Sequence, residues 1–166
     1  MAKSAKIEKT NVMRILDGKK VPYNSYSYAD TDAVSGVDVA AVLSQDPASV
    51  FKTLVTAGRT GSHYVFMIPV AEELDLKKAA AAAGEKSIEM LKAKELLPLT
   101  GYVHGGCSPI GMKKQFPTVF HQTAHDYDHI FVSGGRVGSQ VEVHLEDLSK
   151  IFRYSLADLV VSSQNV

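Results

Sequence analysis

Two β-prone runs joined by a short turn constrain the fold of this chain more than any other feature. Val50–Thr56 and His63–Pro69 are rich in β-branched and aromatic residues, and residues 57–62, with two glycines, separate them. Such a pair predicts an antiparallel hairpin. Further strand-like runs are Tyr23–Tyr28, Thr118–Phe120, His129–Ser133 and Gln140–His144.

Helical patterns are interspersed with these strands. Asp75 is expected to cap an alanine-rich helix that ends at Gly84. Other helices are predicted at Asn11–Leu16, Val37–Leu43, Lys92–Leu97, Leu145–Phe152 and Ser155–Val160. Because no regular βαβ rhythm appears, the sequence predicts an α/β fold in which helices flank a mixed, curved or barrel-like sheet. The 166 residues fit one domain over residues 1–166, with termini expected to fray.

Charge and hydropathy narrow the classes of partner. The chain carries 18 basic and 18 acidic residues, a balance that does not suit a protein coating DNA or other long nucleic acids. The clustered lysines, such as Lys113 and Lys114, are either solvated surface or a short phosphate-contacting edge. No run approaches the roughly 20 apolar residues of a membrane span, and the N-terminus lacks an apolar signal segment. We therefore expect a cytoplasmic protein without a membrane partner.

One lysine occupies an unusual position in the first strand of the hairpin. Strand alternation puts Lys52 on the same face as Val50 and Leu54. A buried ammonium group is costly unless an anion meets it, so a ligand phosphate or carboxylate would explain this placement. The alternative is an edge-strand lysine that blocks aggregation or extends to water.

A glycine-rich loop, Gly101–Gly111, is the second candidate site. Glycine at this density lets the backbone turn sharply and bring its N–H groups close to a ligand. Gly106–Gly111 has the Walker A glycine spacing, but Met112 stands where that motif needs lysine, so a nucleoside triphosphate site is not expected. The loop is either a structural turn or a set of backbone amides for a carbonyl or oxyanion.

Isolated polar residues give weaker signals. Cys107 follows His104 by three residues, which leaves a cysteine nucleophile open, although no third orienting group is nearby. Ser133 ends an apolar strand beside two glycines, where a hydroxyl either satisfies local backbone groups or binds a ligand.

Three histidines, His121, His125 and His129, lie four residues apart and invite a metal site. Strand-like runs on both sides make a shared helical face improbable, and the spacing matches no zinc pattern. We therefore expect surface histidines and no metal.

An ordered set of short motifs runs along the chain. It comprises Val50-Phe51-Lys52-Thr53-Leu54, Pro69-Val70, Leu74-Asp75-Leu76-Lys77-Lys78, Thr100-Gly101-Tyr102, Gly105–Gly111, Lys113-Lys114 and Val132-Ser133-Gly134-Gly135. In this order the motifs resemble the YbaK/EbsC family, the Cys-tRNA(Pro) deacylases related to the editing domain of bacterial prolyl-tRNA synthetases. The resemblance covers about Asn11 to Leu159 and implies a single α/β domain that removes wrongly attached amino acids from tRNA.

The resemblance also implies which residues form the site. Lys52 matches the key lysine of the family, which helps to hold the 3′-terminal nucleotide of tRNA. Tyr28 and Thr53 fall at positions that line the family's substrate pocket. No metal and no cofactor belong to a site of this type.

Residues of the glycine-rich loop match the family segment that binds near the scissile carbonyl. The resemblance therefore implies that the amides of Gly105 and Gly106 stabilise an oxyanion, and that Ser108 and Pro109 contact the substrate. Electrostatic stabilisation and positioning are sufficient chemistry here, because an aminoacyl ester is already activated.

A further part of the site is implied at the S-G-G turn, where Ser133 and Gly134 match. Many members carry an aspartate seven residues after that serine, whereas this chain has Gln140. Glutamine can hydrogen-bond but cannot carry charge or act as a base. This departure leaves open how the α-amino group of the substrate is held.

The activity that the resemblance implies is hydrolysis of a mischarged aminoacyl-tRNA in trans, with Cys-tRNA(Pro) as the expected substrate. In the family mechanism the substrate's own thiol attacks its carbonyl, while the lysine acts as an electrostatic clamp. The expected partners are the acceptor end of tRNA and prolyl-tRNA synthetase. Two alternatives stay open: an Ala-tRNA(Pro) deacylase that uses bound water, and a regulatory module that binds a nucleotide or aminoacyl group without turnover.

Overall fold

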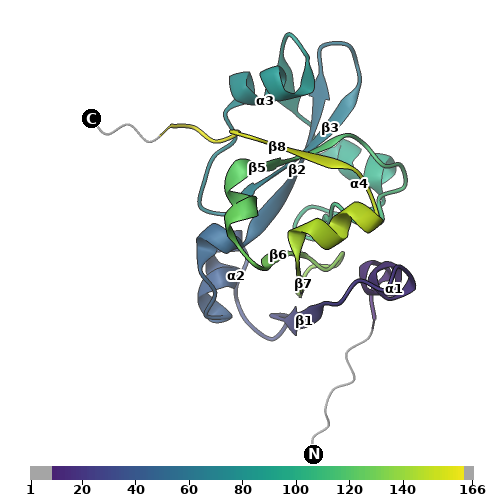
Figure 1. Cartoon of the computed structure of the whole chain (residues 1–166), viewed down its shortest axis with the longest axis vertical. Coiled ribbons are helices and arrows are strands. Elements are labelled where there is room, and N and C mark those ends of the chain that lie inside the picture. The colour runs from purple at the N-terminus through teal and green to yellow at the C-terminus, as the bar shows by residue number, and fades with distance from the viewer. Residues whose placement is uncertain (1–8, 163–166) are drawn as a thin grey trace, which may run out of the picture.

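The computed structural model describes residues 9–162. The termini that were predicted to fray lie outside the described residues. Its strands form two sheets, one above the other in Figure 1. The larger sheet contains β2 (Phe51–Gly58), β3 (His63–Pro69), β4 (Ile88–Met90), β5 (Thr118–His121) and β8 (Tyr154–Ala157). The smaller sheet contains β1 (Asn24–Ser27), β6 (Ile130–Ser133) and β7 (Ser139–Val143).

The hairpin of β2 and β3 forms as predicted, with Lys52 opposite Ile68 in an antiparallel register. Strand β5 then adds parallel to β3, and β8 adds parallel to β5, while β4 pairs antiparallel to β2. The strand order is β4-β2-β3-β5-β8 in the larger sheet and β1-β7-β6 in the smaller one. The predicted α/β fold with a mixed sheet is therefore confirmed.

The strands curve but do not close into a barrel. Between the two sheets the described residues form a single parallel bridge, Val50 to Phe131, although β6 lies beside β2. The largest core cluster nevertheless spans both sheets, with Phe51 from β2, Phe120 from β5 and Val132 from β6 all buried. Side-chain packing, rather than a continuous hydrogen-bond ladder, holds the two sheets together.

The helices follow their local sequence signals. They are α1 (Asn11–Gly18), α2 (Gly36–Val42), α3 (Leu76–Ala83) and α4 (Ala93–Thr100), with 3₁₀ helices η1 (Pro47–Ser49), η2 (Gln122–Asp126) and η3 (Leu145–Lys150). The Asp75 carboxylate accepts hydrogen bonds from the N–H groups of Lys77 and Lys78, and Gly84 ends α3 in the left-handed conformation, as predicted. No helix within residues 9–162 is long and apolar enough to cross a membrane.

Two predicted helices are wrong in detail. Helix α4 does not end before Pro98 but includes it. Pro98 has no N–H to donate to the carbonyl of Lys94, a residue that is exposed at the surface. Ser155–Val160 is not a helix: its first part is β8, in register with β5 from Thr118 to His121. Tertiary pairing overrides the weak helical pattern there.

His121 is buried, contrary to the predicted surface position, whereas His125 and His129 are exposed as expected. Its Nδ1 accepts a hydrogen bond of 3.1 Å from the Leu159 N–H, which ties the end of β5 to the segment after β8. Burial lowers the pKa of His121, although the nearby Asp158 carboxylate partly opposes this shift. The neutral imidazole is therefore a structural acceptor.

Protonation of His121 should destabilise the fold. Because the folded pKa lies below the ordinary value of 6.5, the unfolded chain binds the proton more tightly. The stability that neutral His121 contributes is fully present above the ordinary value of 6.5 and is lost as the pH falls below it. The loss is no more than about 1.4 kcal/mol per pH unit. We expect denaturant unfolding of His121→Asn, which retains an acceptor, to show a flatter acid dependence than wild type. His125→Asn, at an exposed position, should retain the wild-type dependence, and equal slopes for all three proteins would contradict this role.

Candidate functional site

The unpaired part of the β2 edge opens onto a cavity. Strand β4 pairs with residues 56–58 of β2 only, and the neighbouring β6 reaches this edge through the Val50–Phe131 bridge. On this edge of β2, residues 51–54 therefore pair with no other strand of the described chain. A cavity of about 280 Å³ lies here, close to the lower end of the range of small-molecule sites, roughly 300 Å³.

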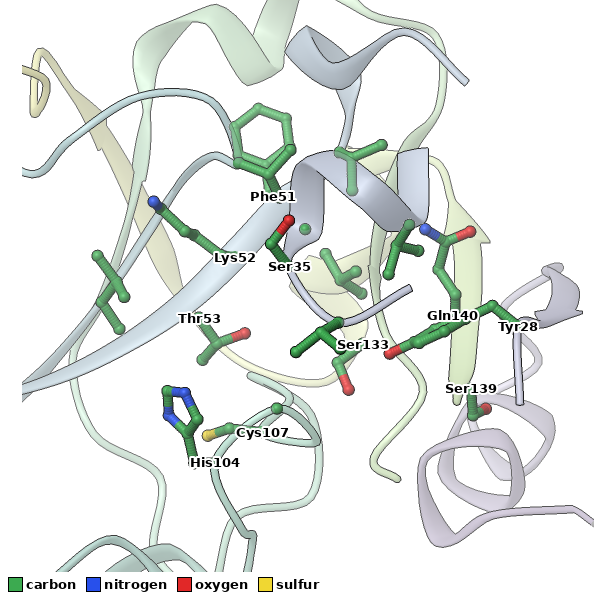
Figure 2. A pocket seen from close by; sticks show the side chains of 18 of the residues that line it. Tyr28, Ser35, Phe51, Lys52, Thr53, His104, Cys107, Ser133, Ser139 and Gln140 are labelled. Atoms are coloured by element: carbon green, nitrogen blue, oxygen red, sulfur yellow. The ribbon is translucent and has the colours of Figure 1, made fainter. Parts of the chain in front are cut away.

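Several predicted site residues, distant in sequence, line this cavity together. They are Tyr28, Lys52, Thr53, Gly105, Ser133 and Gln140. Figure 2 shows Lys52 and Thr53 from β2, His104 and Cys107 from the glycine-rich loop, and Ser133 and Gln140 from β6 and β7. Of the other predicted residues, Gly106, Ser108, Pro109 and Gly134 do not line it.

Lys52 is half-buried at one end of the cavity. Burial lowers the pKa of its ammonium group, and the carboxylates of Glu73 and Glu72 only partly offset this shift. The lysine ion pairs among the described residues involve Lys9, Lys78 and Lys150, but not Lys52. The cavity thus contains a partly desolvated cation without a contacting carboxylate, which suits an anionic ligand group.

Thr53 supplies a second group without a partner. Its Oγ1 is shielded from solvent and has no hydrogen-bond partner among residues 9–162. Figure 2 shows this hydroxyl pointing into the cavity between Lys52 and Ser133. Buried polar atoms are nearly always paired in native proteins, so an unpaired hydroxyl in a cavity indicates a place for a polar ligand atom.

The glycine-rich loop offers backbone amides, but not the pair that was predicted. Gly105 has φ +89°, and the Gly106 N–H already donates a 3.0 Å hydrogen bond to the Val103 carbonyl. In this structure the turn therefore occupies the Gly106 donor that was expected to receive the oxyanion. In the described part of the chain, the N–H groups of Gly105 and Cys107 have no acceptor, and both residues line the cavity.

Gly106 has a packing role instead. A Cβ on it would lie 2.9 Å from the backbone nitrogen of Val137 and 3.2 Å from the Cα of Arg136. The loop thus lies directly against the turn between β6 and β7, where any side chain would force them apart. Ser108 is fully buried behind this contact, and its Oγ accepts a hydrogen bond of 3.3 Å from the Ile110 N–H.

Cys107 is poorly suited to nucleophilic attack. It is buried, and burial raises the pKa of its thiol to about 12, so little thiolate exists at neutral pH. His104 lies beside it in Figure 2 but is exposed, and neither side chain forms a hydrogen bond with the other. The surroundings of Cys107 therefore do not favour a nucleophilic thiol.

The remaining predicted residues contact other groups of the protein. The Ser133 Oγ accepts a 3.1 Å hydrogen bond from the Gly135 N–H, so its own proton is still available to a ligand. Gly134 faces Ser139, which approaches too closely for any larger residue at position 134. Gln140 is buried and forms two reciprocal side-chain hydrogen bonds with Gln45, of 2.7 and 3.0 Å.

Several residues that build this site carry no local signal in the sequence. Gln45 lies in a connection between helices, 95 residues before Gln140 in sequence. Gln45 does not line the cavity itself but hydrogen-bonds Gln140, which does. Ser35 and Gly36, at the start of α2, line the cavity, as does Val70. Only long-range packing brings these residues to the site. Among the described residues, no group of three or more His, Cys, Asp or Glu side chains is arranged so that it could hold a metal ion.

The model of the aminoacyl-tRNA editing domain matches residues 31–151. The chain belongs to this family. A relative from Enterococcus faecalis (strain ATCC 700802 / V583), EbsC, provisionally named a Cys-tRNA(Pro)/Cys-tRNA(Cys) deacylase, is 45% identical over 160 residues. That alignment covers 96% of this chain and 98% of EbsC. The family that the ordered motifs indicated is therefore confirmed.

Two solved structures share the fold of this editing domain. One, provisionally described as a trans-editing enzyme for prolyl-tRNA synthetase, has a TM-score of 0.79 at 21% identity and covers 93% of this chain and 99% of its own. Another, a hypothetical protein, has a TM-score of 0.82 at 20% identity and covers 92% of this chain and 100% of its own. At this identity the likeness concerns the fold alone.

Replacing the unpaired hydroxyl should not weaken the fold. We expect Thr53→Val to raise the free energy of unfolding by up to about 1 kcal/mol, since it removes a desolvated polar group. Thr56→Val is the matched control on the same strand, because the Thr56 Oγ1 donates a 3.0 Å hydrogen bond to the Tyr64 carbonyl. That variant should lose about 1 kcal/mol. Denaturant unfolding measures both, and a loss in Thr53→Val as large as in Thr56→Val would show that the Thr53 hydroxyl is structural.

Proposed function

We propose that this protein is a free-standing editing enzyme that hydrolyses the ester bond of mischarged aminoacyl-tRNA, with Cys-tRNA(Pro) as its main substrate. Membership of the editing-domain family and 45% identity to EbsC support the reaction class. The observation that carries the proposal is the cavity itself, which combines the half-buried Lys52 amine with the unpaired Thr53 hydroxyl. An ester attached to an anionic nucleotide presents complementary groups for both.

The reaction needs positioning more than strong acid–base groups. In a cysteinyl ester the substrate sulfur attacks its own carbonyl carbon, the C–O bond to the terminal ribose breaks, and the ribose oxygen takes up a proton. The resulting thiolactone is then opened by water to give free cysteine. Holding the sulfur near the carbonyl supplies most of the acceleration, because an ester already has a good leaving group.

The chain's own residues would divide the remaining work. Lys52 acts as a clamp for the 3′-terminal nucleotide, where its positive charge meets phosphate. The N–H groups of Gly105 and Cys107 receive the negative charge that develops on the carbonyl oxygen. The Thr53 hydroxyl orients the ester or the thiol, and Tyr28 and Ser133 enclose the same space.

The balanced charge of the chain suits a small footprint on the acceptor end of tRNA. Prolyl-tRNA synthetase is proposed as the partner that supplies further affinity. The competing possibilities are turnover of Ala-tRNA(Pro) by bound water, and aminoacyl binding without turnover.

A deacylation assay with three substrates separates these possibilities. Purified protein is mixed with Cys-tRNA(Pro), Ala-tRNA(Pro) and Cys-tRNA(Cys), each labelled on the amino acid, and release is followed over spontaneous hydrolysis. We expect Cys-tRNA(Pro) to be cleared at least tenfold faster than Ala-tRNA(Pro), because alanine lacks the attacking thiol. Faster loss of Ala-tRNA(Pro) would favour water attack, and no release from any substrate would favour a binding module.

Variants at Lys52 and Cys107 test the assignment of roles. Lys52→Ala should lower deacylation of Cys-tRNA(Pro) by about 100-fold or more, as loss of a charged contact of roughly 3 kcal/mol implies. Lys86→Ala, which removes an exposed lysine that does not line the cavity, should retain wild-type activity. Cys107→Ala should also retain activity, since the thiol stays protonated. If the Cys107 variant alone lost activity while remaining folded, the substrate-thiol mechanism would be wrong.

A further inference from the structure

The cavity carries charge at one end only. Among the described residues that line it there is no aspartate and no glutamate. Its fixed positive charge is Lys52, and Figure 2 places Lys52 and Gln140 at opposite ends. An aminoacyl group bound in this cavity thus meets a cation at one end and neutral groups at the other.

At the neutral end lies Gln140, whose side chain lines the cavity and is paired with Gln45, a residue outside the lining. The Gln45 Nε2 donates to the Gln140 Oε1 at 2.7 Å, and the Gln140 Nε2 donates to the Gln45 Oε1 at 3.0 Å. Each amide therefore satisfies the other, and the 3% exposure of Gln140 removes it from bulk water. The pair holds its geometry without a charge.

The nearest carboxylate on the same strand face is committed elsewhere. Glu142 lies two residues after Gln140 on β7, but its Oε1 accepts hydrogen bonds from the Tyr26 hydroxyl at 2.6 Å and the Asn24 amide at 3.2 Å. Glu142 does not line the cavity. It therefore cannot serve as a contacting counter-ion for a bound ammonium group.

The other titratable side chains that line the cavity include no carboxylate. They are Cys107, whose thiol burial keeps protonated, together with Tyr28 and His104. Glu72 and Glu73 influence Lys52 from outside the lining. A substrate ammonium group at the neutral end would thus lose water without gaining a carboxylate partner, and it would share the cavity with the Lys52 cation at the other end. Both effects are unfavourable.

We propose that this pocket binds the aminoacyl group with its α-amine uncharged, and that the Gln45–Gln140 pair is the specificity-determining feature that keeps the acyl end neutral. The inference rests on the proposed function, because it concerns the same substrate in the same cavity. Free α-amino groups titrate at about 7.7–8.0, so a substantial neutral fraction is present near neutral pH. The pocket selects that fraction.

Binding of a non-hydrolysable analogue tests this selection without the chemical step. The probe is an acceptor-stem RNA hairpin that ends in 3′-amino-3′-deoxyadenosine carrying cysteine through an amide. The control probe carries 3-sulfanylpropanoate, which has the same thiol but no α-amine. For wild type we expect the Kd of the cysteinyl probe to fall about tenfold between pH 6.5 and 8.5 relative to the control probe.

Gln140→Glu is the informative variant. It keeps the size of the side chain and an acceptor for the Gln45 Nε2 while it places a carboxylate at the acyl end. We expect this variant to bind the cysteinyl probe as tightly at pH 6.5 as at pH 8.5. Glu142→Gln, which removes the neighbouring carboxylate outside the cavity, should retain the wild-type pH dependence.

The outcomes separate the two proposals. At each pH the Kd of the cysteinyl probe is divided by the Kd of the control probe. If this ratio for wild type is equal or lower at pH 6.5 than at pH 8.5, the uncharged-amine inference is wrong, whereas the proposed deacylation can still hold. The same pH dependence should appear in 1/KM for Cys-tRNA(Pro) turnover, and its absence there would also overturn the inference. If neither probe binds and no cysteine is released from Cys-tRNA(Pro), the proposed function itself fails.

Discussion

The incomplete pairing of β2 is the constraint on which the site depends. Strand β4 covers only the last part of β2, and β6 approaches its other end through one bridge. A full ladder between β2 and β6 would close the two sheets and fill the space that now forms the cavity. Because the core packs across both sheets, the protein can leave this edge open without losing the connection between them.

This open edge explains why costly groups are tolerated at the site. A half-buried lysine without an ion pair and a shielded hydroxyl without a partner both lower stability in the free protein. Lys52 and Thr53 are neighbours on β2, so their side chains leave the strand in opposite directions. Both nevertheless line the cavity, because the cavity lies against the edge of the strand. A substrate that spans the cavity can satisfy both groups together.

The glycine-rich loop shows how closely structure and chemistry are coupled here. Gly106 uses its N–H to close a turn and its missing side chain to contact the β6–β7 turn. That contact fixes the loop, and Gly105 and Cys107 on either side keep free donors at the cavity. The residue between the two donors is therefore structural, which gives a physical reason for glycine at both 105 and 106.

Local signals in the sequence determined the hairpin, the cap at Asp75 and the stop at Gly84, because these features depend on neighbouring residues only. The order of short motifs along the chain indicated the editing domain. Tertiary structure decided that residues 155–157 are a strand and that His121 is buried. It alone brought Gln45 to Gln140 across 95 residues, since only packing of the whole chain can pair two amides so far apart in sequence.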